Sequence, residues 1–391
     1  MALDEDLLRD VADIEGILAS HTAQAETERQ LPTPVYDALR SKRLFALLLP
    51  RALGGFEVPP TTAYRVWEAV AWIDSAAGWN LSQASAGLLM SGGLSPAGRE
   101  RIFSGNPQPI FAGAGFPPAM AQAVDGGFRI DGRVAFVSGC RHADWIFFVF
   151  LNLIDGKPEA DPASGIPCAR MAFVPRREVE VLDTWHTLGM RGTGSADITF
   201  EGLFVPNEMV SNLSAPTPPS APFDGPLYRL SPWPTIHGEA VVSLGIASAA
   251  IARFMALADR VPAMTAQPLK QRELAQINLG RARALTAAAR AYLYRSAETA
   301  FEAVSAGKPL DMALKIDLQL AACVAAENAA QAVDLLFEAA STASIRLENG
   351  LERYFRDAHV ATQHATKSVA RYGTVGKVLL GLPSDFPLLA G

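Results

Sequence analysis

The chain contains few cysteines and no spacing of cysteine or histidine that is typical of a metal site. Its three cysteines, Cys140, Cys168 and Cys323, lie far apart among 391 residues. This arrangement predicts no disulfide framework and is consistent with a reducing compartment. The six histidines also lack metal-ligand spacing, so we expect no catalytic metal.

Basic tracts and long apolar runs are missing as well. No run of basic residues stands out and the net charge is -6, which argues against nucleic acid as a partner. No uninterrupted apolar run of about 18 residues occurs, and the acidic N-terminus lacks the pattern of a signal peptide. We therefore expect a cytoplasmic protein with no membrane partner.

The sequence does contain abundant apolar residues, 49% of the chain, in two kinds of periodicity. Residues 4–107 show helical spacing. In residues 108–210 the helical period is lost and turn residues are frequent, which predicts short strands in a compact barrel or sandwich. The predicted strands are the alternating segment 127–137, the apolar run 145–151, and the segments 171–175 and 195–200. Residues 213–234 hold seven prolines and are predicted to form a linker or an ordered loop.

Alanine-rich helical patterns follow this segment. They predict helices over 238–259, 271–306, 310–344 and 355–372, and a four-helix bundle is the natural interpretation because alanine allows close helix packing. The expected domains are therefore residues 1–108, helical; 109–212, β-rich; and 213–391, a linker and a helical bundle.

Two segments about fifty residues apart carry the most specific pattern. They are 136–145, FVSGCRHADW, and 188–195, LGMRGTGS, the latter followed by Phe200 and Val205-Pro206. Glycines in the second segment would let the backbone run close to a bound group. Together with the order of helices, strands and helices, these segments resemble the acyl-CoA dehydrogenase superfamily over nearly the whole chain.

This resemblance implies a fold with an α-helical N-terminal domain, a central β-barrel and a C-terminal four-helix bundle, assembled as a homotetramer with flavin at the subunit junctions. It places the Ser138 hydroxyl at the N5 edge of the flavin, where a hydroxyl can donate or accept a hydrogen bond. The implied flavin contacts are Phe136, Val137, Ser138, Gly139, Arg356 and Gly373.

Two departures distinguish the chain from a dehydrogenase. The stretch 111–121 lacks the hydroxyl residues of the Thr-Glu-Pro-x-x-Gly-Ser type segment, and 369–376, VARYGTVG, lacks a carboxylate. Abstraction of an α-proton needs a positioned base, for which Glu239 is a possible alternative. The segment 354–364, YFRDAHVATQH, instead resembles the "RDxxxxxxH" element of the group D flavin-dependent monooxygenases.

On a continuous helix, Arg356 and His364 would lie within roughly 80° of each other. In the monooxygenase family the matching histidine lies by the substrate, which implies that His364 acts as an acid or base there. The segment 78–83, GWNLSQ, resembles a helix at the mouth of the active site. The expected substrate-binding residues are Trp79, Gln83, Met190 and His237.

The resemblance thus predicts the oxygenase component of a two-component flavin-dependent monooxygenase. A flavin reductase would supply reduced FMN or FAD, which would react with O2 to form a C4a-hydroperoxyflavin in a dry pocket. Ser138 and His364 are the expected catalytic residues, and the substrate would be a small aromatic or heteroaromatic compound. The choice of flavin and the position and type of oxygenation stay open.

Two alternatives belong to other classes of function. One is an acyl-CoA dehydrogenase-type FAD oxidoreductase that acts on an acyl thioester with a relocated base. The other is a non-catalytic family member that serves as a scaffold.

Overall fold

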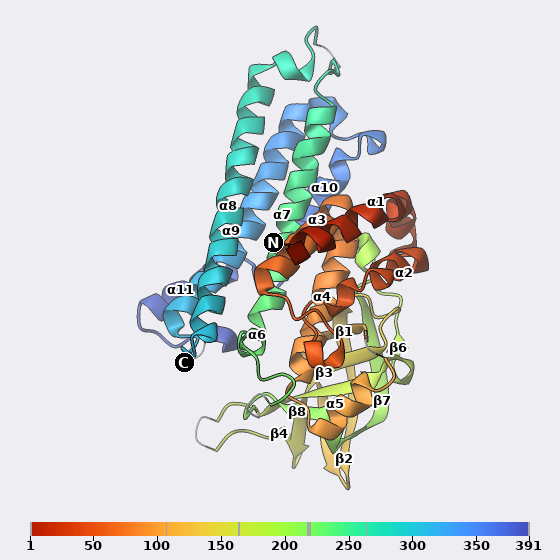
Figure 1. The fold of residues 1–391 in the computed structure, drawn as a ribbon, viewed down its shortest axis with the longest axis vertical. Helices are drawn as coiled ribbons and strands as arrows, with labels where there is room; N and C mark the ends of the chain where they lie inside the picture. Colours follow the sequence, from red (N-terminus) through yellow and green to blue (C-terminus); the bar gives the residue numbers. More distant parts are fainter. Residues whose placement is uncertain (1, 107, 163–164, 217–219, 264, 390–391) are drawn as a thin grey trace.

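The computed structural model describes residues 2–106, 108–162, 165–216, 220–263 and 265–389. Helices precede and follow a single set of strands along the chain. Figure 1 shows the long helices α7, α8 and α9 at one end of the molecule and the strands at the other, with α1, α3 and α4 between them and α5 beside the strands.

Proline in the first turn or a capping side chain marks the start of most N-terminal helices. The N-terminal helices are α1 (Ala2–Glu28), α2 (Thr33–Ser41), α3 (Pro60–Ile73), α4 (Ser75–Ser91) and α5 (Pro96–Phe103). Proline occupies the first turn of α2, α3 and α5, where its missing N–H would have no helical partner. The Asp74 carboxylate caps α4 by accepting a hydrogen bond from the Ala77 amide at 2.8 Å.

The strands form one mainly antiparallel sheet. They are β1 (Phe111–Val124), β2 (Gly127–Val137), β3 (Trp145–Ile154), β4 (Lys157–Pro158), β5 (Ala169–Pro175), β6 (Glu180–Val181), β7 (Ala196–Pro206) and β8 (Val210–Asn212). Their order is β6-β7-β2-β1-β3-β5-β8, with β4 on β3 and a parallel pairing of β1 with β3. The sequence predicted β2, β3, β5 and β7 but no strand at β1, whose Ala-Gly-Ala-Gly stretch has low strand propensity.

The C-terminal helices confirm three of the four predicted segments. They are α6 (Pro226–Arg229), α7 (Trp233–Ala256), α8 (Glu273–Ser305), α9 (Met312–Ala340), α10 (Leu351–Thr362) and α11 (Ala370–Leu379). The prediction of one helix over 355–372 is wrong, because α10 ends at Thr362 and α11 begins only at Ala370. The intervening residues 363–369 carry His364.

Two helices are long and apolar enough to cross a membrane by length and composition. Their windows, within Trp233–Ala256 and Met312–Ala343, have mean hydropathies of 1.5 and 1.3. A search for uninterrupted apolar runs does not find these two helices, because a few polar residues interrupt each of them. Within the fold, 72% and 56% of these windows are buried, and α7 and α9 pack against each other and against α8. They are core helices of this fold.

Glycines set the distance between α3, α4 and α7. A Cβ at Gly245 of α7 would lie 2.7 Å from the Ala71 Cβ of α3, and a Cβ at Gly78 of α4 would lie 2.6 Å from the same atom. Because such contacts exclude any larger side chain, α4 and α7 both approach α3 closely at Ala71. This packing fixes α4 and α7 relative to each other, and these two helices carry Trp79 and Glu239.

We predict that Gly245→Ala destabilises the protein by about 1–3 kcal/mol through overpacking. The matched control is Gly280→Ala on α8, where an added Cβ meets no atom within 4 Å and should stabilise the helix by about 0.5–1 kcal/mol. Thermal unfolding of both variants checks the prediction. Equal shifts in Tm for the two variants would contradict it.

Candidate functional site

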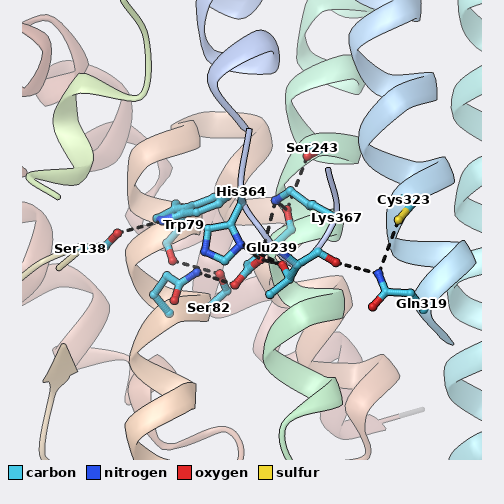
Figure 2. Close-up of polar contacts among 11 residues, drawn as sticks. Trp79, Ser82, Ser138, Glu239, Ser243, Gln319, Cys323, His364 and Lys367 are labelled. Carbon is cyan, nitrogen blue, oxygen red and sulfur yellow. Dashed lines mark hydrogen bonds and ion pairs between the residues drawn. The ribbon is translucent and has the colours of Figure 1, made fainter. Parts of the chain in front are cut away.

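Three of the predicted site residues, from distant parts of the chain, lie in contact. Trp79 of α4 donates a hydrogen bond from its Nε1 to the Ser138 Oγ at 3.0 Å, just beyond the end of β2. The edge of the same indole contacts the His364 ring, with 5.6 Å between ring centroids and planes at 70°. Figure 2 shows Trp79 between Ser138 on one side and His364 and Lys367 on the other. Trp79 therefore connects the strand end to the C-terminal segment.

A buried carboxylate lies behind His364. Glu239 of α7 is 3% exposed, and its Oε2 lies 2.8 Å from the His364 Nδ1. The same Oε2 accepts a hydrogen bond from the Thr366 hydroxyl at 2.7 Å, and Oε1 accepts one from the Gln83 amide at 2.8 Å. Gln83 is thus linked to His364 through Glu239.

Lys367 supplies the positive charge of this cluster. Its Nζ donates to the Glu239 backbone carbonyl at 3.0 Å and lies 4.4 Å from the centroid of the Trp79 ring. Burial lowers the pKa of Lys367 to about 8, although Glu239 opposes this shift. Burial alone would raise the pKa of Glu239, but His364, Lys367 and Thr366 together bring it down to about 2. The carboxylate is therefore ionised at neutral pH.

The break between α10 and α11 explains how this cluster assembles. Gln319 of α9 donates a hydrogen bond to the Thr366 carbonyl at 2.7 Å, while Thr366 and Lys367 both reach Glu239. Consecutive residues on a helix point about 100° apart, so a continuous helix would not direct both side chains at the same residue. The expectation that Arg356 and His364 lie on one continuous helix is wrong, because His364 lies beyond the end of α10.

The two sequence motifs are joined by a chain of hydroxyl groups. The Ser138 Oγ lies 2.7 Å from the Ser195 Oγ, which lies 2.7 Å from the Thr193 Oγ1. Thr193 in turn donates to the Met190 carbonyl at 2.8 Å. Gly139 has a φ of +71°, and a Cβ there would lie 2.8 Å from the Tyr36 hydroxyl, so this position requires glycine.

An apolar surface adjoins Ser138. Phe136 has a φ of +63° and leaves 68% of its surface exposed, and its ring packs edge-on to Trp185 with 6.3 Å between centroids. Within the described part of the chain, neither amide atom of buried Asn80 has a hydrogen-bond partner. A left-handed phenylalanine that exposes its ring is unusual and marks a candidate binding surface.

Arg356 and Asp357 hold the 188–195 loop to α10. Arg356 lies 2.8 Å from the Glu26 carboxylate and donates to the Leu188 carbonyl at 2.8 Å. Buried Asp357 accepts hydrogen bonds of 2.5 Å from the Ser75 hydroxyl and from the Met190 amide. Met190, a predicted substrate contact, is itself buried. Arg356 and Asp357 therefore fix the 188–195 loop, which contains the hydroxyl groups of Thr193 and Ser195.

In the described part of the chain, neither His237 nor Gly373 forms a hydrogen bond, ion pair or ring contact with Trp79, Ser138, Glu239 or His364. His237 is fully buried on α7, and its Nε2 lies 2.9 Å from the Leu318 carbonyl. Burial lowers the pKa of His237 to about 4, so the ring is neutral. Val137 is buried in the sheet, and Gly373 lies on α11.

Sequence reasoning missed Thr193, Ser195, Thr366 and Lys367 as members of the site. The first two lie inside the 188–195 motif, which was the available signal. From the sequence, Glu239 is expected only as an alternative base, although a carboxylate within an apolar helical segment is itself a sign of a buried polar cluster. Lys367 gave no signal of its own, because only the tertiary fold brings it to Glu239.

The carboxyl group of Asp357 predicts a pH dependence of stability. Burial raises the pKa of Asp357 to about 6, although the positive charge of Arg353 opposes this shift. Between the unfolded pKa of about 3.9 and this value, the folded state binds more protons, so the contribution of Asp357 to stability falls as pH rises. Asp357→Asn should therefore gain stability relative to the wild type between pH 4 and pH 7. Urea unfolding at both pH values measures this difference, and a constant difference would contradict the prediction.

Comparison with known proteins supports one family. Residues 237–368 match the family model described as "Acyl-CoA dehydrogenase, C-terminal domain". Indole-3-acetate monooxygenase of Pseudomonas putida is 30% identical over 91% of this chain and 89% of its own length. The flavin-dependent monooxygenase, oxygenase subunit HsaA, of Rhodococcus jostii is 27% identical over 94% and 96% of the two chains.

A solved structure extends the similarity to the whole fold. XiaF from Streptomyces sp., in complex with FADH2 and glycerol, superimposes with a TM-score of 0.90 at 25% identity over 99% of this chain and 98% of its own. The relatives from Pseudomonas putida and Rhodococcus jostii are named monooxygenases, which favours an oxygenase over the dehydrogenase alternative. The chain therefore belongs to the flavin-dependent monooxygenases with an acyl-CoA dehydrogenase-like fold, the oxygenase components of two-component systems.

Proposed function

We propose that this oxygenase takes reduced flavin from a separate flavin reductase and uses it with O2 to oxygenate a small aromatic or heteroaromatic compound. The observation that carries the proposal is the contact of Trp79 with both Ser138 and His364. The relatives supply the substrate class, since their names include indole-3-acetate monooxygenase and an FADH2-dependent resorcinol hydroxylase, oxygenase component.

The residues around Ser138 fit a flavin. An isoalloxazine ring is flat and apolar on its faces and carries polar atoms along its edges. The exposed ring of Phe136 and the neighbouring Trp185 offer an apolar surface, and the partly exposed Ser138 hydroxyl lies next to it. Gly139 keeps the backbone free of a Cβ at this point. Phe136, Val137, Ser138 and Gly139 are therefore our proposed flavin contacts.

Reduced flavin, when bound, supplies the electrons that activate O2 for transfer to the substrate. The chain's own contribution is a positioned base. Because the ionised Glu239 carboxylate can only accept hydrogen bonds, the His364 Nδ1 that faces it at 2.8 Å carries a proton. In neutral His364 the Nε2 lone pair is then free to take the proton of a phenol or an indole N–H. Ser138 and His364 are thus the proposed catalytic residues.

Lys367 allows this base to work away from water. The cluster buries a carboxylate next to His364, and an unpaired buried charge would be strongly unfavourable. Lys367, under the Trp79 ring, compensates that charge without reaching the surface. An activated oxygen species decays in contact with water, so a site wall that excludes water favours transfer of the oxygen atom to the substrate.

The finer architecture is also a proposal. We infer an α-helical N-terminal domain, a central β-barrel and a C-terminal four-helix bundle, in a cytoplasmic homotetramer with flavin at the subunit junctions. The whole-chain similarity to XiaF supports the order of the three parts along the chain. Flavin contacts of Arg356 and Gly373, and substrate contacts of Gln83, Met190 and His237, stay predictions.

Anaerobic rapid mixing tests the proposed function. Apoprotein mixed with reduced FAD or FMN, and then with O2, should show a transient absorbance that precedes oxidised flavin, because the site protects the reacting flavin from water. The flavin that gives the longer-lived signal is the one used. Immediate reoxidation with both flavins, together with bleaching of tightly held FAD by an acyl-CoA, would instead indicate a dehydrogenase.

Replacement of His364 tests the base. His364→Ala should reduce substrate oxygenation by about 10²–10⁴-fold, the usual contribution of a general base, while flavin oxidation continues with release of hydrogen peroxide. His359→Ala is the matched control, since His359 of α10 lies 2.8 Å from Asp334 and outside the cluster. Product and peroxide yields for both variants provide the measurement. Equal losses of product in the two variants would contradict the assignment.

A further inference from the structure

The chain of hydroxyl groups behind Ser138 has a fixed direction. Thr193 Oγ1 lies 2.8 Å from the Met190 carbonyl oxygen. A carbonyl oxygen only accepts hydrogen bonds, so the single hydroxyl proton of Thr193 points to Met190. The opposite arrangement would place two oxygen atoms at this distance with no proton between them. The row of hydroxyl groups therefore ends at the Met190 carbonyl, and Thr193 has no second proton to donate to Ser195.

The remaining protons follow from this anchor. Ser195 must donate to Thr193 across their 2.7 Å contact, because the Thr193 proton is engaged. Ser138 must then donate to Ser195 across the second 2.7 Å contact. Thr193 and Ser195 are both buried. The neighbouring hydroxyl groups, and not bulk water, therefore set the direction of each hydrogen bond.

Trp79 fixes the other side of Ser138. An indole N–H only donates, and Trp79 Nε1 lies 3.0 Å from the Ser138 Oγ. Ser138 thus gives its one proton to Ser195 and receives one from Trp79. A hydroxyl oxygen has two lone pairs, so Ser138 keeps one lone pair and no proton for a ligand on its open side.

We propose that Thr193 and Ser195 are positioning residues that turn Ser138 into a hydrogen-bond acceptor toward the flavin, and that they thereby make the site select reduced over oxidised flavin. This inference rests on the proposed function, in which Ser138 faces the flavin N5. Reduced flavin carries a proton on N5 and donates it to the Ser138 lone pair. Oxidised flavin has only a lone pair on N5, which faces the Ser138 lone pair without a hydrogen bond.

The redox dependence of binding tests this proposal. Dissociation constants for reduced and oxidised flavin, measured anaerobically by equilibrium dialysis, give the preference of each variant. In Ser195→Ala the Ser138 proton loses its acceptor and turns toward the ligand, so binding of oxidised flavin strengthens. The preference for reduced flavin should fall roughly fivefold to tenfold, the effect of one hydrogen bond. The midpoint potential of bound flavin should fall with it, by about 20–30 mV for two electrons.

Two variants of Thr193 test the same proposal without relying on Ser195→Ala. Thr193→Val removes the anchoring hydroxyl at nearly constant volume and should lower the preference, whereas Thr193→Ser keeps the hydroxyl and should preserve it. In a Ser138→Ala background, Ser195→Ala should have no further effect on the preference. A purely structural role would lower the affinities for both redox states alike.

The results distinguish a failure of the proposed function from a failure of the role given to Thr193 and Ser195. A wild-type protein that binds neither redox state of flavin would overturn the proposed function itself. A wild-type protein that prefers reduced flavin, with the same preference in Ser195→Ala and Thr193→Val, would leave the function in place and overturn the role of the hydroxyl chain.

Discussion

The buried carboxylate of Glu239 is the group on which the arrangement of the site depends. A charge in the interior is tolerated only with a counter-charge and hydrogen bonds. Glu239 obtains them from Gln83 on α4 and from Thr366, Lys367 and His364 beyond α10. The requirement to satisfy this carboxylate therefore brings α4, α7 and residues 363–369 together and fixes His364 against Trp79.

A second buried carboxylate fixes the opposite side of the site. Asp357 accepts a hydrogen bond from the Met190 amide, and the Met190 carbonyl accepts one from the Thr193 hydroxyl at the end of the chain of hydroxyl groups. The direction of the protons at Ser138 is thus set by a loop that α10 holds in place. Figure 2 shows the side of Trp79 that faces Glu239 and Lys367, with Ser138 at the opposite edge of the indole. Trp79 is the contact between the two halves.

Local pattern predicted much of the fold, because α7, α8, α9 and the strands β2, β3, β5 and β7 follow their own periodicity. It failed at 363–369, where contacts with Glu239 and Gln319 override helix propensity. Motif resemblance singled out Trp79, Ser138 and His364, which the fold brings together. Lys367 was beyond prediction, since its place depends on a partner more than a hundred residues away. Arg356 forms ion pairs within the chain that its motif did not indicate.

A crystal structure of the anaerobic protein with reduced flavin would test the central claim most directly. That claim is that the flavin binds at Ser138 and that the His364 base faces the substrate in front of it. The account predicts the isoalloxazine ring against Phe136 and Gly139, with N5 within hydrogen-bond distance of the Ser138 Oγ and the His364 Nε2 directed into the space in front of the flavin. A flavin bound away from Ser138, or a His364 Nε2 directed away from the bound flavin, would contradict it.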